Sequence, residues 1–446
     1  MSSATGRRVS VVGAGLGGAM MGIYLARRGF AVDVFERRPD LRTLDVPGPS
    51  MNLGLSRRGI ESLGRVGLAE TVLAMGIPMA GRIIHDLDGR TTFQPYGRNG
   101  DQVIHALQRN DINRALLEAL GACGNVRLHF ETRCSGFDRD TGTARFLDDA
   151  GRETAATADA WVGADGLHST IRQTMQRGLR ADYQQEYLDW GWKELRIPSG
   201  PGGTFPLEKN AFHLWPRGGS LLFAHPNRDG SFTCSLVLPF HGAVSLESLA
   251  DGEQVRDFFT RTYPDLVPLV PDLAEQFLKN PIVPLVSIRT SPWSYRDRVV
   301  LLGDAAHAVV PFYAQGMNAA FEDCALLDRC LEAHPGNRGA AFQEYERNRK
   351  RHTDALAEMS KQNFLVLRDR VRSPLQRARH TLDTALSRVV GDLWAPLHAR
   401  VTNTSIPYAD ALELERRQDR IVKWAGIALG AGVGIALLRV LSGRNR

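Results

Sequence analysis

The sequence lacks the cysteine pattern of a disulfide framework or a structural zinc site. Its 446 residues contain five scattered cysteines with no CxxC pair, namely Cys123, Cys134, Cys234, Cys324 and Cys330. An odd, dispersed set of this kind is typical of a reduced, intracellular protein. The N-terminus also lacks a signal-peptide pattern, because its first apolar run ends in a glycine loop. We therefore expect a cytoplasmic protein.

Strong net charge is also missing. The formal net charge of +6 is small for this length, and no aromatic-interleaved basic stretch indicates nucleic-acid binding. No residue spacing suggests a Ser/His/Asp triad or a metal centre. With 43% hydrophobic and 23% charged residues, the composition is that of a globular protein of two or three domains.

A glycine-rich turn follows the first apolar run. Val9–Val12 reads as a strand, and Gly13, Gly15 and Gly18 follow it as GxGxxG before a helical stretch. A second strand, Ala31–Phe35, ends at Glu36, where a ribose-binding acid is expected. The glycines allow close approach of a pyrophosphate, and the helix N-terminus offsets its charge. Glu36 favours an adenosine with a free 2′-hydroxyl, a condition that FAD and NAD both satisfy.

Two later strand ends favour FAD over NAD. Trp161–Gly166 is an apolar strand ending in a turn that contains Asp165. Val299–Leu302 is another, and Asp304 follows it at the edge where α/β sheets place ligand contacts. A helix then opens at Gln315–Asn318, and its free N–H groups could face an electron-rich ring. An NAD dehydrogenase has no use for the strand ends at Asp165 and Asp304.

Together these motifs resemble the single-component, FAD-dependent aromatic hydroxylases. Strings outside the flavin motifs are more specific and are similar to the kynurenine 3-monooxygenases, including Ser50–Gly59, Gly76–Met79, Arg82–His85, Lys193–Pro198 and His213–Arg217. The resemblance covers roughly residues 8–410. It implies an oxidoreductase of tryptophan catabolism that hydroxylates L-kynurenine to 3-hydroxykynurenine through a flavin C4a-hydroperoxide. FAD stays bound, NADPH or NADH is the transient reductant, and O2 and a small aromatic amino acid are the partners.

The expected fold is α/β: a Rossmann-like FAD-binding domain, a β-sheet substrate domain and a C-terminal helical region. Residues 180–280 alternate apolar and polar positions as an antiparallel sheet does, interrupted by a helix-like stretch at Ser245–Tyr263. The expected boundaries are 1–75, 97–178 and 281–335 for the FAD-binding domain, 76–96 and 179–280 for the substrate domain, 336–420 for the helical cap and 421–446 for an apolar tail. The oligomeric state stays open.

The resemblance also implies site residues. No side chain is expected to act as a catalyst, because the reacting oxygen comes from the flavin. The substrate-binding residues would be Arg82, Tyr96, Asn363 and Tyr408, of which Arg82 and Tyr96 bind the carboxylate. The cofactor-binding residues would be Gly13, Gly15, Gly18, Glu36, Arg37, Arg109, Asp165, Asp304, Met317 and Asn318. No metal is expected.

Two departures from the family pattern bear on the substrate. Tyr313 and Ala314 stand where the family usually has Phe or His and then Gly, close to the flavin and the substrate. They leave open a ring-substituted kynurenine or a related anthranoyl compound as the substrate. An oxygen-independent flavin reductase and a non-catalytic, membrane-associated flavoprotein are the alternatives from other classes.

The C-terminal tail has two interpretations. Trp424–Leu438 is 15 residues without charge, which falls short of the ~20 residues that a bilayer span needs. Gly426, Gly430 and Gly434 lie four residues apart, as on helices that pack closely in lipid. The tail is therefore either a membrane-associated helix or a helix packed on protein.

Overall fold

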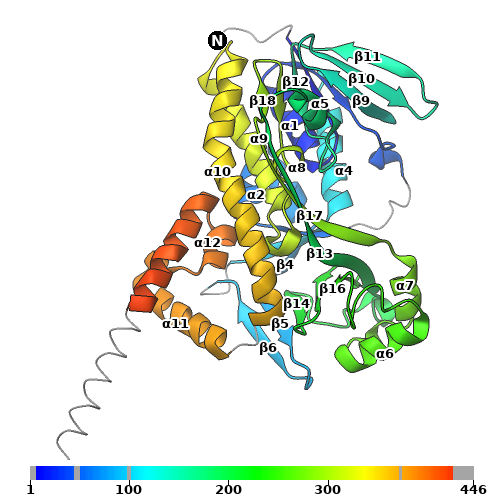
Figure 1. Ribbon diagram of the computed structural model, residues 1–446, viewed down its shortest axis with the longest axis vertical. Helices are drawn as coiled ribbons and strands as arrows, with labels where there is room; N and C mark the ends of the chain where they lie inside the picture. The colour runs from blue at the N-terminus through cyan, green and yellow to red at the C-terminus, as the bar shows by residue number, and fades with distance from the viewer. Residues whose placement is uncertain (1–6, 45–50, 98–101, 371–373, 425–446) are drawn as a thin grey trace, which may run out of the picture.

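The computed structural model describes residues 7–44, 51–97, 102–370 and 374–424. Figure 1 shows an α/β region at one end, a second sheet region at the other, and the long helix α10 (Arg338–Leu365) running beside both. This is the expected mixed α/β architecture with a C-terminal helical region. Most of the apolar tail, residues 425–446, lies outside the described residues.

The α/β region is built on a six-stranded sheet with the order β18-β19-β12-β1-β2-β8. All neighbours are parallel except β18, which is antiparallel to β19. Its strands are β1 (Arg8–Val12), β2 (Ala31–Phe35), β8 (Val126–His129), β12 (Ala160–Gly163), β18 (Ser294–Tyr295) and β19 (Val299–Leu301). The central strands are buried almost throughout, which explains their continuous apolar sequence. The strands expected at 9–12, 31–35 and 299–302 are confirmed within one residue.

Helices and two small sheets complete this region. The helices are α1 (Leu16–Arg27), α2 (Arg57–Arg65), α3 (Ala69–Leu73), α4 (Arg109–Gly121), α5 (Thr170–Gln176), α8 (Asp304–His307) and α9 (Gly316–Ala333). One small sheet contains β3 (Asn52–Leu55), β7 (Ile104–Gln108) and β4 (Ile77–Met79). The other contains β11 (Glu153–Thr157), β10 (Thr143–Asp148) and β9 (Thr132–Asp138). Because β1, β12 and β19 are adjacent and parallel, the three turns that follow them meet at one edge of the sheet.

The second region is a seven-stranded sheet with the order β17-β13-β16-β15-β14-β5-β6. Its strands are β5 (Gly81–His85), β6 (Thr91–Pro95), β13 (Asp182–Ile197), β14 (Ala211–Pro216), β15 (Leu221–Pro226), β16 (Phe232–Pro239) and β17 (Ile282–Ser291). The antiparallel sheet expected from residues 180–280 is present and gains β5, β6 and β17. The helix expected at Ser245–Tyr263 is α6 (Gly252–Thr262), because the Asp251 carboxylate caps it by accepting from the N–H groups of Glu253 and Gln254.

The two faces of this sheet have different partners. One face packs against α6 and α7 (Leu273–Lys279), where Trp215 and Leu222 meet Phe259. The other face carries Leu214 and Phe223, which cluster with Phe312. Alternation along the strands therefore turns Arg82, Phe212 and His225 toward the α/β region and away from α6 and α7.

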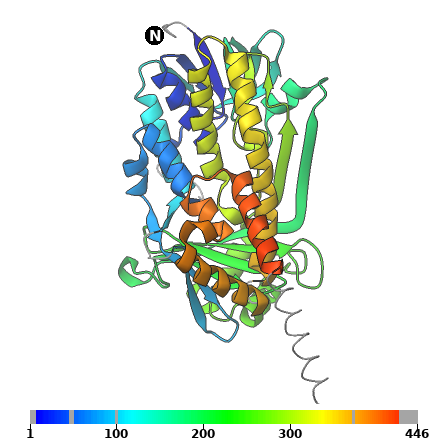
Figure 2. The same ribbon diagram turned by 90° about the vertical axis from the view of Figure 1, so that its left-hand side faces the viewer.

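The C-terminal region is helical, as expected. It contains α10, α11 (Pro374–Val390), α12 (Leu397–Asn403) and a helix over residues 408–424. Figure 2 shows α11, α12 and this last helix gathered beside the lower part of α10. Within the described residues, we find no helix that is both long and apolar enough to cross a membrane.

Candidate active site

The glycine loop after β1 is closely packed at its ends and open in its middle. A methyl group on Gly18 would lie 1.8 Å from the carbonyl oxygen of Gly13, so α1 can start here only if residue 18 is glycine. On Gly15, the nearest described atom would be Arg109 Nη2, at 4.0 Å. The room above Gly15 fits a pyrophosphate, which would face backbone N–H groups and a guanidinium.

Glu36 ends β2 beside this loop. Its Oε2 accepts a hydrogen bond from the Ala14 N–H at 2.8 Å, and its Oε1 accepts one from the Arg38 N–H at 3.0 Å. A cavity of about 250 Å³ opens here. It is lined by Ala14, Gly15, Glu36, Arg38, Pro39, Leu41, Leu44, Arg109, Asn110, Asn113, Leu117 and Phe130. A carboxylate together with aliphatic and aromatic side chains suits the ribose and adenine of a dinucleotide.

Two arginines line this cavity, Arg38 and Arg109. Arg37, which the resemblance indicated, is exposed and is not among the lining residues. Consecutive side chains leave the backbone in different directions, and the motif does not say which of the two faces the ligand. Arg38 and Phe130 are thus two lining residues that the sequence did not single out.

Arg109 interacts electrostatically with two carboxylates, Glu36 and Asp304, which are expected to bind opposite ends of the cofactor. Burial lowers the pKa of Arg109 and Arg38 lowers it further, whereas Asp304 and Glu36 raise it. For Asp304, burial raises the pKa, and His307 and Arg109 oppose this. The side chains of Arg109 and Asp304 keep solvent-exposed surface although many protein atoms lie near them, as expected for groups that line a recess. The net positive charge of Arg38 and Arg109 suits an anionic pyrophosphate.

Asp165 lies in the turn that packs on the glycine loop. A methyl group on Gly13 would lie 2.4 Å from the carbonyl oxygen of Ala164 and 3.1 Å from Asp165 Cα. The Asp165 carboxylate accepts from the Ser169 hydroxyl and the Ile171 N–H, and burial raises its pKa. Asp165 therefore holds the start of α5 beside the site where the pyrophosphate would bind.

The N-terminus of α9 is tied to β3. Asn318 is buried; its Oδ1 accepts from the Ser56 N–H at 3.0 Å, and its Nδ2 donates to the carbonyl oxygens of Gly54 and Ala314 at 2.8 and 2.9 Å. Met317 is also buried. A methyl group on Gly316 would meet no described atom within 4 Å. The first turn of α9 is thus held by the hydrogen bonds of Asn318, while the space beside Gly316 is open and could take a flavin ring.

Arg82 brings an unbalanced charge to the neighbouring sheet. Its Nε donates to Gln94 Oε1 at 2.9 Å. Burial lowers the pKa of Arg82, and the electrostatic neighbours that oppose this are the phenols of Tyr96 and Tyr313. Across the described ranges, no carboxylate forms an ion pair with Arg82. A guanidinium surrounded in this way is suited to an incoming anion.

Tyr96 and Tyr313 are joined by an aromatic side chain from α12. The Tyr96 ring stacks on His398 with centroids 5.3 Å apart, and Tyr313 stacks on His398 at 6.0 Å. Burial raises the pKa of both phenols, so both stay protonated at neutral pH. The structure therefore brings Arg82, Tyr96 and the unusual Tyr313 together, and it adds His398, which the sequence did not indicate.

Asn363 and Tyr408 reach the 311–315 loop from the helical region. Asn363 Nδ2 donates to the Phe312 carbonyl oxygen at 2.7 Å. The Tyr408 hydroxyl donates to Gln315 Oε1 at 3.0 Å, and its ring is fully buried with the Arg58 guanidinium 4.2 Å from its centroid. Both residues thus fix the 311–315 loop by hydrogen bonds, Asn363 at Phe312 and Tyr408 at the Gln315 side chain.

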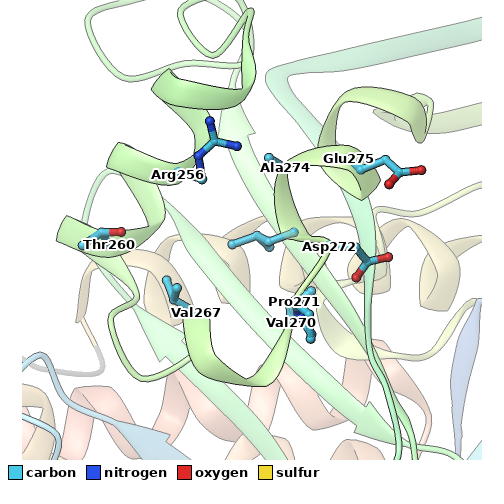
Figure 3. A pocket seen from close by; sticks show the side chains of 9 residues that line it. Arg256, Thr260, Val267, Val270, Pro271, Asp272, Ala274 and Glu275 are labelled. Atoms are coloured by element: carbon cyan, nitrogen blue, oxygen red, sulfur yellow. The ribbon is translucent and has the colours of Figure 1, made fainter.

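A second cavity is remote from this cluster. A hollow of about 320 Å³ lies between α6 and α7. Arg256 and Asp272 are among the residues that line it (Figure 3). It lies on the face of the seven-stranded sheet opposite Arg82, so the sheet separates it from the 311–315 loop. In the part of the chain that the structure covers, no group of three or more His, Cys, Asp or Glu side chains could hold a metal ion.

Comparisons with known proteins show to which family this chain is similar. A family model described as an FAD binding domain matches residues 7–216 and 270–360. The kynurenine 3-monooxygenase of Salinispora arenicola is 50% identical, over 96% of this chain and 95% of the relative. That of Salinispora tropica is 49% identical, over 98% and 95%. That of Dictyostelium discoideum is 37% identical, over 93% and 92%.

Solved structures match the fold at lower identity. The 2-methyl-3-hydroxypyridine-5-carboxylic acid oxygenase superposes with a TM-score of 0.67 at 20% identity, over 83% of this chain and 95% of that one. P. aeruginosa PqsL in complex with 2-aminobenzoylacetate gives 0.64 at 23% identity, over 82% and 98%. At these identities the likeness extends to the fold alone.

Proposed function

The chain belongs to the kynurenine 3-monooxygenase family of FAD-dependent aromatic hydroxylases, and we propose that it hydroxylates the ring of L-kynurenine to 3-hydroxykynurenine. The enzyme is a flavin aromatic monooxygenase, and its reductant is NADPH or NADH. When bound, FAD accepts a hydride from this reductant and activates O2. The protein must then place the aromatic ring, exclude water and neutralise the charged end of the substrate.

The observation that carries the substrate proposal is the unbalanced charge of Arg82. A kynurenine carboxylate would meet the planar guanidinium and the Tyr96 hydroxyl, which together offer several donors to one anion. Asn363 and Tyr408 complete the substrate site through their bonds to the 311–315 loop. The apolar side chains of Phe212 and Phe223 on the same face, together with Phe312 of the 311–315 loop, would exclude water from the ring, which limits unproductive loss of peroxide.

The cofactor proposal follows the recess from the glycine loop to α9. Glu36 would bind the ribose, Arg109 the pyrophosphate and Asp304 the ribityl chain. The full proposed set is Gly13, Gly15, Gly18, Glu36, Arg37, Arg109, Asp165, Asp304, Met317 and Asn318, to which the cavity lining adds Arg38. The open glycines, the surplus of positive charge and the two carboxylates support this set.

The domain boundaries and the role of the tail are likewise proposals. We propose an FAD-binding domain of residues 1–75, 97–178 and 281–335, a substrate domain of 76–96 and 179–280, and a cap of 336–420. For residues 421–446 we keep two alternatives, membrane association and packing on protein. Co-sedimentation of the full chain with anionic liposomes, compared with a chain ending at residue 424, distinguishes them.

Identification of the product tests the function directly. The purified holoprotein should consume O2 and NADPH faster when kynurenine is added, and mass spectrometry should find kynurenine carrying one additional oxygen atom on its ring. Substrate reduction without oxygen uptake would favour a flavin reductase instead. Absence of turnover with either nicotinamide nucleotide would favour a non-catalytic flavoprotein.

A second candidate substrate is a ring-substituted kynurenine or a related anthranoyl compound. It is favoured by Tyr313, whose phenol lies in the electrostatic neighbourhood of Arg82 and is unusual for the family. Competition between kynurenine and a ring-methylated kynurenine, followed by mass spectrometry of both products, ranks the two. A higher kcat/KM for the methylated compound would make it the preferred substrate.

A further inference from the structure

His225 lies in line with Arg82 on the inner face of the seven-stranded sheet. In the parallel pair of β14 and β5, Phe212 is directly opposite Arg82. The Phe212 ring and the His225 imidazole have centroids 4.8 Å apart on the adjacent strands β14 and β15. Side chains opposite one another on neighbouring strands share a face. Arg82 and His225 are thus separated by two strand spacings, roughly 10 Å between Cα atoms.

This face is the one that the 311–315 loop covers. Phe223, two residues before His225 on β15, has its ring 5.9 Å from the imidazole. Phe223 belongs to the cluster that contains Val310 and Phe312, which flank the start of the 311–315 loop. His225 therefore faces the site, whereas its neighbour Ala224 packs toward α6 and α7.

The imidazole of His225 is half-buried and packs against aromatic rings. Its ring contacts are Phe212 and Phe223, and no described residue forms a hydrogen bond with either ring nitrogen. Burial lowers its pKa to about 4, so the ring is neutral at physiological pH. By contrast, His213 contacts His85 and the Glu208 carbonyl oxygen, and His307 contacts Asp323.

A packing role does not explain a histidine here. His225 is only partly buried, and neither of its ring nitrogens is among the described side-chain atoms that are buried without a hydrogen-bond partner. An aliphatic side chain of similar size would pack equally well against Phe212 and Phe223, whereas the imidazole keeps polar atoms open to a ligand. Metal binding does not explain it either, because the described residues supply no group of three ligands. The ring nitrogens are therefore open to a ligand that lies between Arg82 and the 311–315 loop.

We propose that His225 is a specificity-determining residue that hydrogen-bonds the aromatic end of the substrate while Arg82 binds its carboxylate. This inference rests on the proposed function and refines it. An anthranoyl ring carries an aryl amine beside its ketone, and a neutral imidazole can accept a hydrogen bond from that amine. The site would therefore select amino acids that carry an ortho-aminoaryl ketone over those with an unsubstituted phenyl ketone.

Binding of two ligands to the oxidised holoenzyme tests this. The probes are kynurenine and 2-amino-4-oxo-4-phenylbutanoate, which lacks the aryl amine, and the readout is the dissociation constant from changes in the flavin absorption spectrum. Wild type should prefer kynurenine by about tenfold or more, the range that one buried hydrogen bond supplies. In His225→Leu this preference should fall to within about threefold, while His225→Gln should keep part of it.

Controls separate this role from a general effect on the fold. His241→Leu changes an exposed histidine on a loop and should leave the preference at its wild-type value. If His225→Leu fails to retain FAD, the comparison of His225→Gln with His225→Met replaces it. A preference unchanged in the apolar variant would overturn the inference. Failure of wild type to bind either ligand would instead overturn the proposed function.

Discussion

The Arg349 guanidinium donates from Nε to Asp323 Oδ1 at 2.6 Å, and both side chains are buried. The other carboxylate oxygen of Asp323 lies 2.6 Å from His307 Nε2 and accepts from the Gly303 N–H at 3.1 Å. Asp323 thus links α10 to the turn that carries Asp304. The pair therefore connects the helical region to the turn of the proposed cofactor site.

Neutralising Asp323 should destabilise the fold. Burial alone raises the pKa of Asp323, but His307 and Arg349 outweigh it and the net pKa lies below the ordinary value. Asp323→Asn should lower the free energy of unfolding by about 3 kcal/mol, the lower end for a broken buried pair, because Glu322 still contacts Arg349 at 2.7 Å. Urea unfolding at pH 7 measures the change, and the exposed Asp88→Asn should show none.

The same pair also predicts a pH dependence. A carboxyl with a depressed folded-state pKa stabilises the protein above its unfolded pKa and ceases to do so as the pH falls through the folded value. Wild type should therefore lose this contribution only in acid, below about pH 4. Asp323→Asn should lose less stability than wild type over that range. An equal loss would contradict the assignment of the charge to Asp323.

Arg82→Ala should weaken kynurenine binding while FAD stays bound. Loss of charge-assisted hydrogen bonds of roughly 1.5–3 kcal/mol corresponds to a KM increase of about 10- to 100-fold. Arg82→Lys should fall between the two, because it keeps the charge and loses the planar fork. Steady-state kinetics and the flavin-to-protein absorbance ratio measure both properties. Arg90→Ala, in the exposed turn of the same hairpin, is the control, and a normal KM in Arg82→Ala would rule out the carboxylate assignment.

Local sequence determined the scaffold of the cofactor site well. The apolar runs before Gly13, Gly163 and Gly303 became adjacent parallel strands, because strands buried on both faces need such runs and their turns meet at one edge. The helix mouth at Gly316–Asn318 followed from the same pattern. These features depend on periodicity and turn chemistry over a few residues.

The rest depends on contacts between distant segments. Asp323 and Arg349 are 26 residues apart on different helices, and neither carries a local signal of burial. His225 occupies an ordinary strand position, and only the structure shows that its ring contacts are the aromatic side chains of Phe212 and Phe223. Tyr408 could be assigned from the resemblance, but its place behind Gln315 follows from the packing of residues 408–424. Arg38 lines the cavity beside Glu36, and no local pattern distinguishes it from Arg37, which the resemblance indicated.

Ala314→Gly should stabilise the protein. Ala314 has φ +51° and ψ 36°, the left-handed conformation that costs a residue with a Cβ roughly 1–2 kcal/mol. The gain is partly offset by the larger entropy loss of glycine, so an increase in the free energy of unfolding of up to about 1 kcal/mol is expected. Ala308→Gly, where φ is −63°, should lower it instead. Chemical denaturation of both variants measures the contrast, and a decrease in both would argue against strain at residue 314.

Glu415→Gln should make the melting temperature depend less on pH around neutrality. Burial, aided by Asp419 and Asp383 and opposed by Arg379 and Arg400, raises the pKa of Glu415 from 4.5 to about 7. The folded state therefore binds this proton more tightly than the unfolded chain. Its stabilising contribution is complete below about pH 4.5 and is lost as the pH rises through 7. Melting temperatures from pH 5 to pH 8 should fall more steeply for wild type than for Glu415→Gln. Glu413→Gln, an exposed change on the same helix, should follow wild type, and parallel curves for all three proteins would place the titration elsewhere.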